Sequence, residues 1–187
     1  LLIASEEITS SLFGYGSFDY LSVKNSANAL FYFAFGLPAF SMIKIFSSFL
    51  FARHNTKIPF YFSLLSVVLN VFISVYFFDK IGFIIIPIAT TISSWFNSIL
   101  LFIFLKKRNL FNFNLIFFSN LIKIILTTII MGFLFNYLIS FFEANLAYEQ
   151  SYKAVYLIGI VAISLISYLL IAILFKAFKI NDINLKY

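Results

Sequence analysis

The chain has 187 residues, of which 63% are hydrophobic and 11% charged, and its formal net charge is +6. Soluble globular domains carry about 25% charged residues, and a chain this apolar has too few polar side chains to cover a surface in water. The composition therefore excludes an ordinary soluble domain and predicts an all-α protein that crosses a membrane several times.

Apolar segments separated by short polar turns predict the helices. Residues 1–13 are expected to be the end of a helix whose start lies upstream, followed by a glycine turn at residues 14–16. Asp19 is expected to cap the next helix. Complete membrane helices are expected at about residues 20–52, 58–78, 82–105, 114–140 and 154–178. The predicted fold is a polytopic transmembrane bundle of about five complete helices plus the end of one more.

The segment 20–52 would form a helix of about 50 Å, which exceeds a hydrocarbon core of about 30 Å. Pro38 removes one helical hydrogen bond and clashes with the carbonyl of Ala34, and Gly36 adds flexibility. We therefore expect a kink at Gly36 and Pro38 near the middle of the membrane. It is either a static bend or a hinge for alternating access, since broken helices recur in transporters.

Lys44 lies inside this apolar segment, nine residues before Arg53 and therefore about 13 Å from it along a helix. A cation at this depth costs about 2.5–3.5 kcal/mol on insertion scales, and no acidic residue lies one turn away. Two interpretations remain open. Lys44 lines a polar route that attracts an anionic headgroup, or its side chain extends to the nearby interface.

Two stripes of small polar residues follow at helical spacing, one in segment 58–78 and one in segment 82–105. Such stripes let membrane helices pack closely and form hydrogen bonds, or they line a cavity. Asn70 and Asn97 are the members hardest to leave facing lipid, so they are candidate substrate-pathway residues with Lys44. The stripes are Ser63, Ser66, Asn70 and Ser74, and Thr90, Ser93, Ser94 and Asn97, from which Trp95 points away.

The basic residues between helices predict the orientation, because cytoplasmic loops are enriched in Lys and Arg. Eight lie on one side and three on the other, so the richer side and the C-terminus are expected in the cytoplasm. Their spacing, in small clusters one membrane crossing apart, excludes a nucleic-acid-binding face. The two sets are Arg53, Lys57, Lys106, Lys107, Arg108, Lys176, Lys179 and Lys186, and Lys24, Lys80 and Lys153.

The residue inventory argues against catalysis by this segment. All seven carboxylates fall at predicted helix ends or in loops, so paired acid–base chemistry has no buried site. Nucleotide-binding and hydrolase motifs are absent from the sequence. With no cysteine and one histidine, His54 in a basic turn, neither a thiolate nor a histidine-rich metal site is expected. We expect no cofactor, no metal and no enzyme activity.

Three stretches resemble one known family. The first stretch consists of Gly36-Leu37-Pro38-Ala39, then Lys44, and then the turn 51–59 (FARHNTKIP) with Arg53, Lys57 and Pro59. It is similar to a signature of the MviN/MurJ family. Asn55 replaces the family's usual acidic residue, and Phe51 a frequent Tyr. Residues 12–19 and 82–101 resemble the family's periplasmic turn and twelfth helix. The resemblance covers roughly residues 10–108.

The resemblance implies the C-terminal part of a fourteen-helix lipid II flippase of the bacterial inner membrane, with cytoplasmic termini. Residues 1–108 would belong to the C-terminal transport lobe. Residues 109–187 would hold the last two membrane helices, a groove for the undecaprenyl tail and a short cytoplasmic tail. The implied partners are the bilayer, lipid II and the upstream helices of the same protein. Lys44 matches a position where the family often has lysine, whereas the family's essential arginines lie mainly in helices that this chain lacks.

Other functions remain open at this point. A flippase of the same superfamily that moves O-antigen or another polysaccharide-lipid would have a similar helix pattern. A membrane-embedded polyprenyl-phosphate transferase is a different class, and it normally needs acidic residues or a metal near the membrane face. A truncated paralogue that serves as a scaffold is a third alternative.

Overall fold

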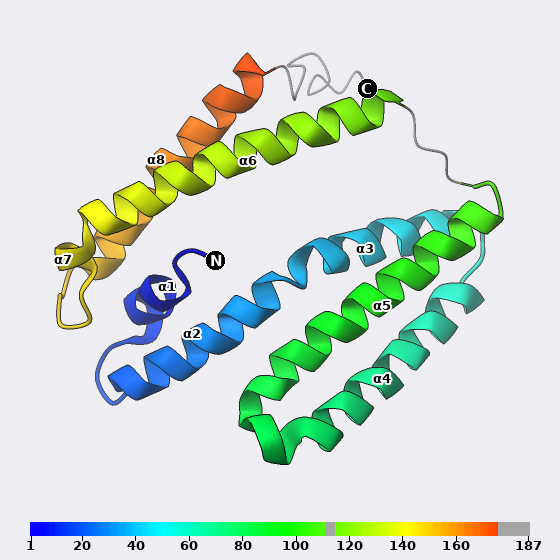
Figure 1. The fold of residues 1–187 in the computed structure, drawn as a ribbon, viewed down its shortest axis with the longest axis horizontal. Helices are drawn as coiled ribbons and strands as arrows, with labels where there is room; N and C mark the ends of the chain where they lie inside the picture. The colour runs from blue at the N-terminus through cyan, green and yellow to red at the C-terminus, as the bar shows by residue number, and fades with distance from the viewer. Residues whose placement is uncertain (111–114, 176–187) are drawn as a thin grey trace. The chain divides into compact units, whose positions relative to one another are not determined.

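The computed structural model describes residues 1–110 and 115–175, and every regular element in these ranges is a helix (Figure 1). The prediction of an all-α membrane bundle is therefore confirmed. The elements are α1 (Ser5–Phe13), α2 (Tyr20–Ala34), α3 (Leu37–Ala52), α4 (Lys57–Ile81), the 3-10 turn η1 (Gly82–Ile84), α5 (Ile85–Lys107), α6 (Leu115–Phe141), α7 (Glu143–Leu146) and α8 (Lys153–Leu174).

Long apolar stretches make this a multi-pass membrane protein. Lys57–Lys107, Phe117–Phe141 and Lys153–Leu174 are long and apolar enough to cross a bilayer, and α2 with α3 passes the same test as a bent pair. The first stretch comprises α4, η1 and α5. The chain reverses direction at η1, so that α5 folds back along α4 (Figure 1). The predicted basic tail with Lys176, Lys179 and Lys186 lies outside the described residues, so the orientation stays a prediction.

The start of α2 follows the expected capping chemistry. The backbone N–H of Ser22 donates to Oδ1 of Asp19 at 2.8 Å, which satisfies one of the free donors of the first turn. Hydrogen bonds from Ser22 hold the pKa of the Asp19 carboxyl below its usual range. In the preceding turn Gly16 has a φ of 62°, a conformation that favours glycine. The predicted turn and N-cap are both confirmed.

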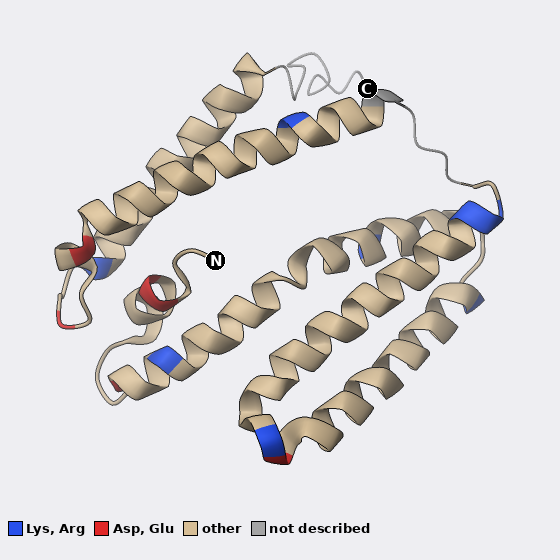
Figure 2. Cartoon of the chain, viewed as in Figure 1, with Lys and Arg blue, Asp and Glu red and all other residues tan. Residues whose placement is uncertain are grey.

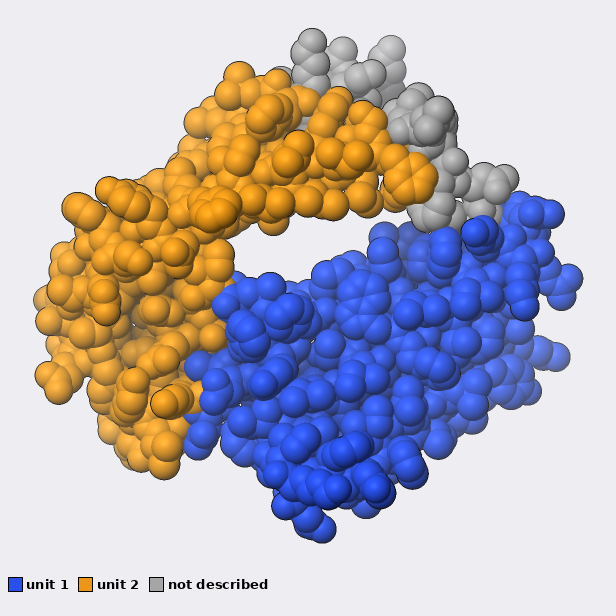
Figure 3. Space-filling model, in the orientation of Figure 1, with its two compact units in different colours: residues 1–2, 25–112 blue, residues 3–24, 113–187 orange. Residues whose placement is uncertain are grey.

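The chain forms two compact units, which Figure 3 shows in different colours. Unit 1 comprises residues 1–2 and 25–112, and α5 is its central helix because α3 and α4 both pack along it. Its apolar core joins α3 to the C-terminal half of α5 through Phe46, Leu50, Leu101 and Leu105. The predicted division of the chain at residue 108 is a functional one and stays a prediction.

Unit 2 comprises residues 3–24 and 113–187. The helices α6 and α8 pack together. Near one end of this pair, α1 packs against α8, and α7 packs against both α6 and α8. Its apolar core consists of Ala4, Phe135, Ile139, Leu146, Leu157 and Ile160.

A buried lysine joins three segments of unit 2. Lys153, expected between two helices, is the first residue of α8 and its side chain is fully buried. Its Nζ donates to the carbonyls of Gly14 (2.8 Å) and Tyr148 (2.7 Å) and to Oγ of Ser10 (3.2 Å). The same atom lies 4.5 Å from the ring centroids of Tyr15 and Tyr148. These contacts tie the end of α1 to the start of α8.

The dipole of α1 favours the position of the Lys153 ammonium. A cation at the N-terminus of its own helix is unfavourable, but here the ammonium lies at the C-terminal end of α1, where a cation is stabilised. Gly14 permits the approach, because a Cβ at this residue would lie 3.0 Å from the lysine Nζ.

We expect Lys153→Met to lower the free energy of unfolding by about 2 kcal/mol, because it leaves two buried acceptors and one partly buried acceptor without their donor. The measurement is the apparent Tm of the purified protein in detergent, compared with Lys24→Met at an exposed position of α2. Equal Tm values for the two variants would show that the buried ammonium contributes nothing to stability.

Candidate functional site: a polar groove beside a broken helix

The predicted kink is present as a break between two helices. The axes of α2 and α3 differ by 43°, and Phe35 and Gly36 lie between them. Pro38 falls in the first turn of α3, where a missing N–H costs no helical hydrogen bond. The proline therefore begins a new helix and does not distort a continuous one. Whether Gly36 and Pro38 form a moving hinge stays a prediction.

Side chains of α5 satisfy the backbone at the break. Thr91 Oγ1 donates to the carbonyl of Tyr32 at 2.9 Å, and Trp95 Nε1 donates to the carbonyl of Phe35 at 3.0 Å. Gly36 allows this close approach, since a Cβ there would lie 3.1 Å from Thr91 Oγ1. Trp95 thus points away from the polar stripe of α5, as predicted. Its hydrogen bond to the backbone at the break could not be predicted from its position in the sequence.

The two polar stripes face each other across α4 and α5. Asn70 Nδ2 donates to the hydroxyls of Thr90 (3.1 Å) and Ser93 (3.3 Å), and Asn97 Nδ2 donates to Ser63 Oγ at 3.3 Å. A cavity of about 260 Å³ remains among these side chains, with Ile43 of α3 on one wall. The stripes therefore pack the two helices together and also line a cavity, so the two interpretations of the sequence are compatible.

Asn97 carries an unused acceptor in this cavity. The residue is 6% exposed, and its Oδ1 atom has no hydrogen-bond partner within the part of the chain that the structure describes. Leaving a buried acceptor unpaired costs about 1–3 kcal/mol. Asn97 thus lines the cavity with an amide whose buried acceptor is unsatisfied among the described residues.

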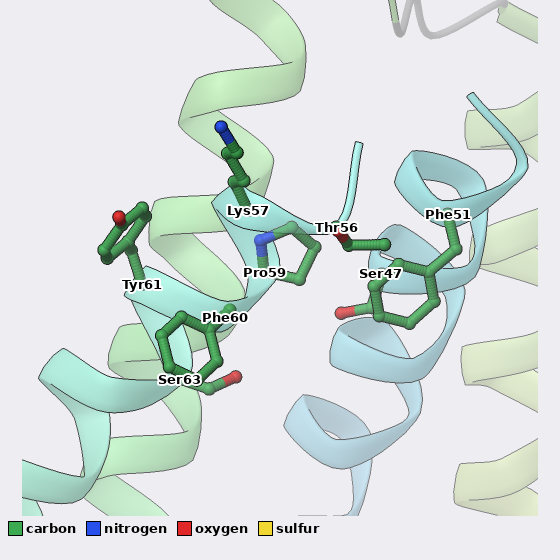
Figure 4. Close-up of a pocket in the computed structure, with 8 residues that line it drawn as sticks. All are labelled: Ser47, Phe51, Thr56, Lys57, Pro59, Phe60, Tyr61 and Ser63. Carbon is green, nitrogen blue, oxygen red and sulfur yellow. The ribbon is translucent and has the colours of Figure 1, made fainter. Parts of the chain in front are cut away.

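A second and larger cavity lies beside the first, towards the turn between α3 and α4. It has a volume of about 590 Å³, and Ser47 and Phe51 of α3 face Pro59, Phe60 and Ser63 of α4 across it (Figure 4). Ser63 lines both cavities, which therefore adjoin. Together they form a groove between α3 and α4, called the α3–α4 groove below.

Lys44 lies on the side of α3 that borders this groove. Residues 44, 47 and 51 share one face of a helix, and Ser47 and Phe51 line the larger cavity. The Lys44 side chain is exposed and forms no hydrogen bond or ion pair with any described residue. The structure brings Asn70 and Asn97 to one cavity, whereas Lys44 lines neither cavity. The role of Lys44, in binding a ligand or in extending to the interface, stays a prediction.

The predicted turn motif closes one end of the groove. Arg53 stacks its guanidinium 4.7 Å from the ring centroid of Phe49, and Lys57 begins α4. Pro59 is buried in the first turn of α4 and lines the larger cavity. Asn55, which replaces an acidic residue, accepts a long hydrogen bond through Oδ1 from the backbone N–H of Ile58 in the first turn of α4, at 3.4 Å.

The groove has the groups needed to bind a ligand. Its described lining contains hydroxyl and amide groups, aromatic rings and the cation Lys57, with Lys44 on the adjoining helix face and no carboxylate. Such a surface hydrogen-bonds polar groups and attracts an anion.

Comparison with known proteins gives a consistent family. A family model described as "Lipid II flippase MurJ" matches residues 1–158. The chain is 29% identical over 174 residues to a probable lipid II flippase MurJ of Rhizobium meliloti, covering 92% of this chain and 32% of the relative. A protein of the same name from Thermotoga maritima is 34% identical over 146 residues, covering 78% and 29%. Another from Rickettsia prowazekii is 32% identical over 109 residues, covering 58% and 22%. The chain thus spans about a third or less of these relatives.

The groove generates a labelling prediction, which the absence of cysteine from this chain makes simple to test. We expect Lys44→Cys and Ser47→Cys to react with a membrane-impermeant thiol reagent, because both positions border a polar groove. Val75→Cys is the control, since Val75 is 73% exposed on a purely apolar face of α4. Reaction is followed by gel shift in intact cells and in membranes opened on both sides. Labelling of Val75→Cys alone would contradict a hydrated groove.

Proposed function

The chain belongs to the MurJ family of lipid II flippases, and on this basis we propose that it forms the C-terminal part of a flippase for a lipid-linked oligosaccharide. The substrate is lipid II, the undecaprenyl-linked peptidoglycan precursor, which the complete protein moves across the bacterial inner membrane without covalent chemistry. The family match over residues 1–158 is the observation that carries this proposal. The upstream helices of the same protein complete the transport cavity.

The smaller cavity of the α3–α4 groove, which Asn70 and Asn97 line, is the part of the substrate pathway that this chain contributes. Lys44 attracts the anionic portion of the headgroup, and Asn70 and Asn97 offer amide groups to its neutral polar portion. An exposed cation beside a polar groove in an apolar helix supports this assignment, since charged residues within membrane spans usually face such cavities.

Gly36 and Pro38 act as the hinge of alternating access in this proposal. The 43° break supports it, because discontinuous helices are common at transporter binding sites.

Residues 1–108 belong to the transport lobe. Residues 109–187 form the last two membrane helices, with a groove for the lipid tail, and a cytoplasmic tail. The basic turn with Arg53, Lys57 and Pro59 faces the cytoplasm, as the distribution of Lys and Arg suggests.

We expect Lys44→Gln, introduced into the complete protein, to reduce lipid II translocation about tenfold or more, because the groove loses its mid-helix cation while the volume is nearly kept. Translocation is measured as lipid II that becomes accessible in the outer leaflet of cells depleted of their own flippase. Lys44→Arg is expected to retain most activity, because it keeps the charge.

Lys24→Gln is the matched control, since Lys24 is an exposed lysine of α2 that lines neither cavity of the groove. Full translocation by Lys44→Gln at normal membrane levels would contradict the role of Lys44 in transport. Lysis of depleted cells that express the unaltered complete protein would contradict lipid II as the substrate and favour another polysaccharide-lipid.

A further inference from the structure

Positive charge gathers at one end of unit 1 without any compensating carboxylate. Five cations lie where α3 and α5 end and α4 begins (Figure 2). Among the described residues of unit 1 the single carboxylate is Asp79, at the opposite end of α4. The basic end therefore carries an uncompensated field that attracts anions. The five cations are Arg53, Lys57, Lys106, Lys107 and Arg108.

The larger cavity of the α3–α4 groove opens at this basic end, and it is amphipathic. The rings of Phe51 and Phe60 flank it, and Lys57 stands at its rim (Figure 4). The hydroxyls of Ser47 and Thr56 line it and have no hydrogen-bond partner within the described residues. The cavity thus offers free hydroxyls and a cation at its mouth and aromatic surface inside.

The depth of this cavity matches the boundary of a bilayer. It extends from Lys57, where the apolar stretch begins, to Ser63, six residues along α4 and about 9 Å deeper. The polar interface occupies about 5–8 Å on each side of the hydrocarbon core. The rim therefore lies at headgroup level, and the deep end of the cavity at Ser63 lies at the level of the first acyl carbons. Phe60 is 64% exposed, so the surrounding lipid has access to it.

The turn that forms the rim is held in one conformation. The N–H of Asn55 donates to the carbonyl of Leu50 at 3.0 Å while His54 has a φ of 57°, which is a helix end of the Schellman type. Arg53 stacks on Phe49 at the same turn. The end of α5 repeats this arrangement with Asn109 at a φ of 52° and Arg108 stacked on Phe104 at 5.8 Å. The cation-bearing turns are ordered before any ligand binds, which reduces the entropy cost of binding.

We propose that this pocket binds an anionic phospholipid of the surrounding leaflet, with its phosphate at Lys57 and Thr56 and one acyl chain between Phe51 and Phe60. Basic pockets between membrane helices bind anionic headgroups, and the paired aromatic rings provide the apolar surface that an inorganic anion would not use. The choice of a bilayer lipid follows from the position of the pocket at the interface and from its access to lipid. The proposal does not depend on the transported substrate.

The test uses the complete protein in phosphatidylcholine nanodiscs that contain a trace of spin-labelled lipid. Electron paramagnetic resonance gives the immobilised fraction for spin-labelled phosphatidylglycerol and for spin-labelled phosphatidylcholine. We expect a preference for phosphatidylglycerol that falls about fivefold in Lys57→Gln, because one lysine near the surface contributes about that factor. Lys80→Gln is the matched control, since Lys80 is an exposed lysine near the other end of the same helix.

Two further variants separate the parts of the site. Ser47→Phe fills the cavity without changing charge, and we expect it to reduce the immobilised fraction of both labelled lipids. Thr56→Val removes one hydroxyl and is expected to weaken only the phosphatidylglycerol preference. The apparent Tm of each variant confirms that it is folded.

Equal effects of Lys57→Gln and Lys80→Gln would overturn the proposal, because the preference would then reflect overall charge. An unchanged phosphatidylglycerol preference in folded Thr56→Val, or an unchanged immobilised fraction of both lipids in folded Ser47→Phe, would also overturn it. Displacement of the label by a substoichiometric polyprenyl diphosphate, at a concentration where unlabelled phosphatidylglycerol has no effect, would assign the pocket to a polyprenyl ligand instead.

Discussion

A break in a membrane helix is tolerated only if the freed backbone groups find partners, because the hydrocarbon core supplies no water. In unit 1 the partners come from α5, through Thr91 at the carbonyl of Tyr32 and Trp95 at the carbonyl of Phe35. The direction change between α2 and α3 is thus fixed from a neighbouring helix and not by Pro38 alone. Because α3 leaves the break at a new angle, the same two hydrogen bonds also help to set where α3 lies relative to α5.

The buried face of α5 changes character along its length, and this change explains where the groove lies. Its first part buries small or polar residues such as Ala89, Ser93 and Asn97, whereas its last part buries Leu101 and Leu105 in the apolar core. Lipid tails are as apolar as leucine, so close approach and hydrogen bonds hold membrane helices together where side chains are small. Small side chains also leave space. The cavity beside Asn97 is therefore a consequence of how α4 and α5 are packed.

The sequence predicted much of this fold because the strongest signals are local. The length of the apolar segments predicted the membrane helices. Asp19 predicted the start of a helix, and Gly36 with Pro38 predicted the position of the break. The spacing of the polar stripes placed each stripe on one helix face, and the structure shows that the two faces meet. Contacts between distant segments were not predictable in the same way. Lys153 resembles an ordinary loop cation in the sequence, and its burial depends in part on the carbonyl of Gly14, more than a hundred residues away. The partner of Trp95 was missed for the same reason.

Lys44 and Lys153 show two different outcomes for a cation in an apolar chain. The ammonium of Lys153 is fully buried and has three hydrogen-bond acceptors and two aromatic rings, so its contacts within the fold account for its presence. Lys44 has no such partners among the described residues, although a lysine in the middle of a membrane helix costs about 2.5–3.5 kcal/mol. Nothing in the described fold offsets that cost at Lys44. The compensation must therefore come from outside these contacts, through water, lipid headgroups or a bound anion at the α3–α4 groove.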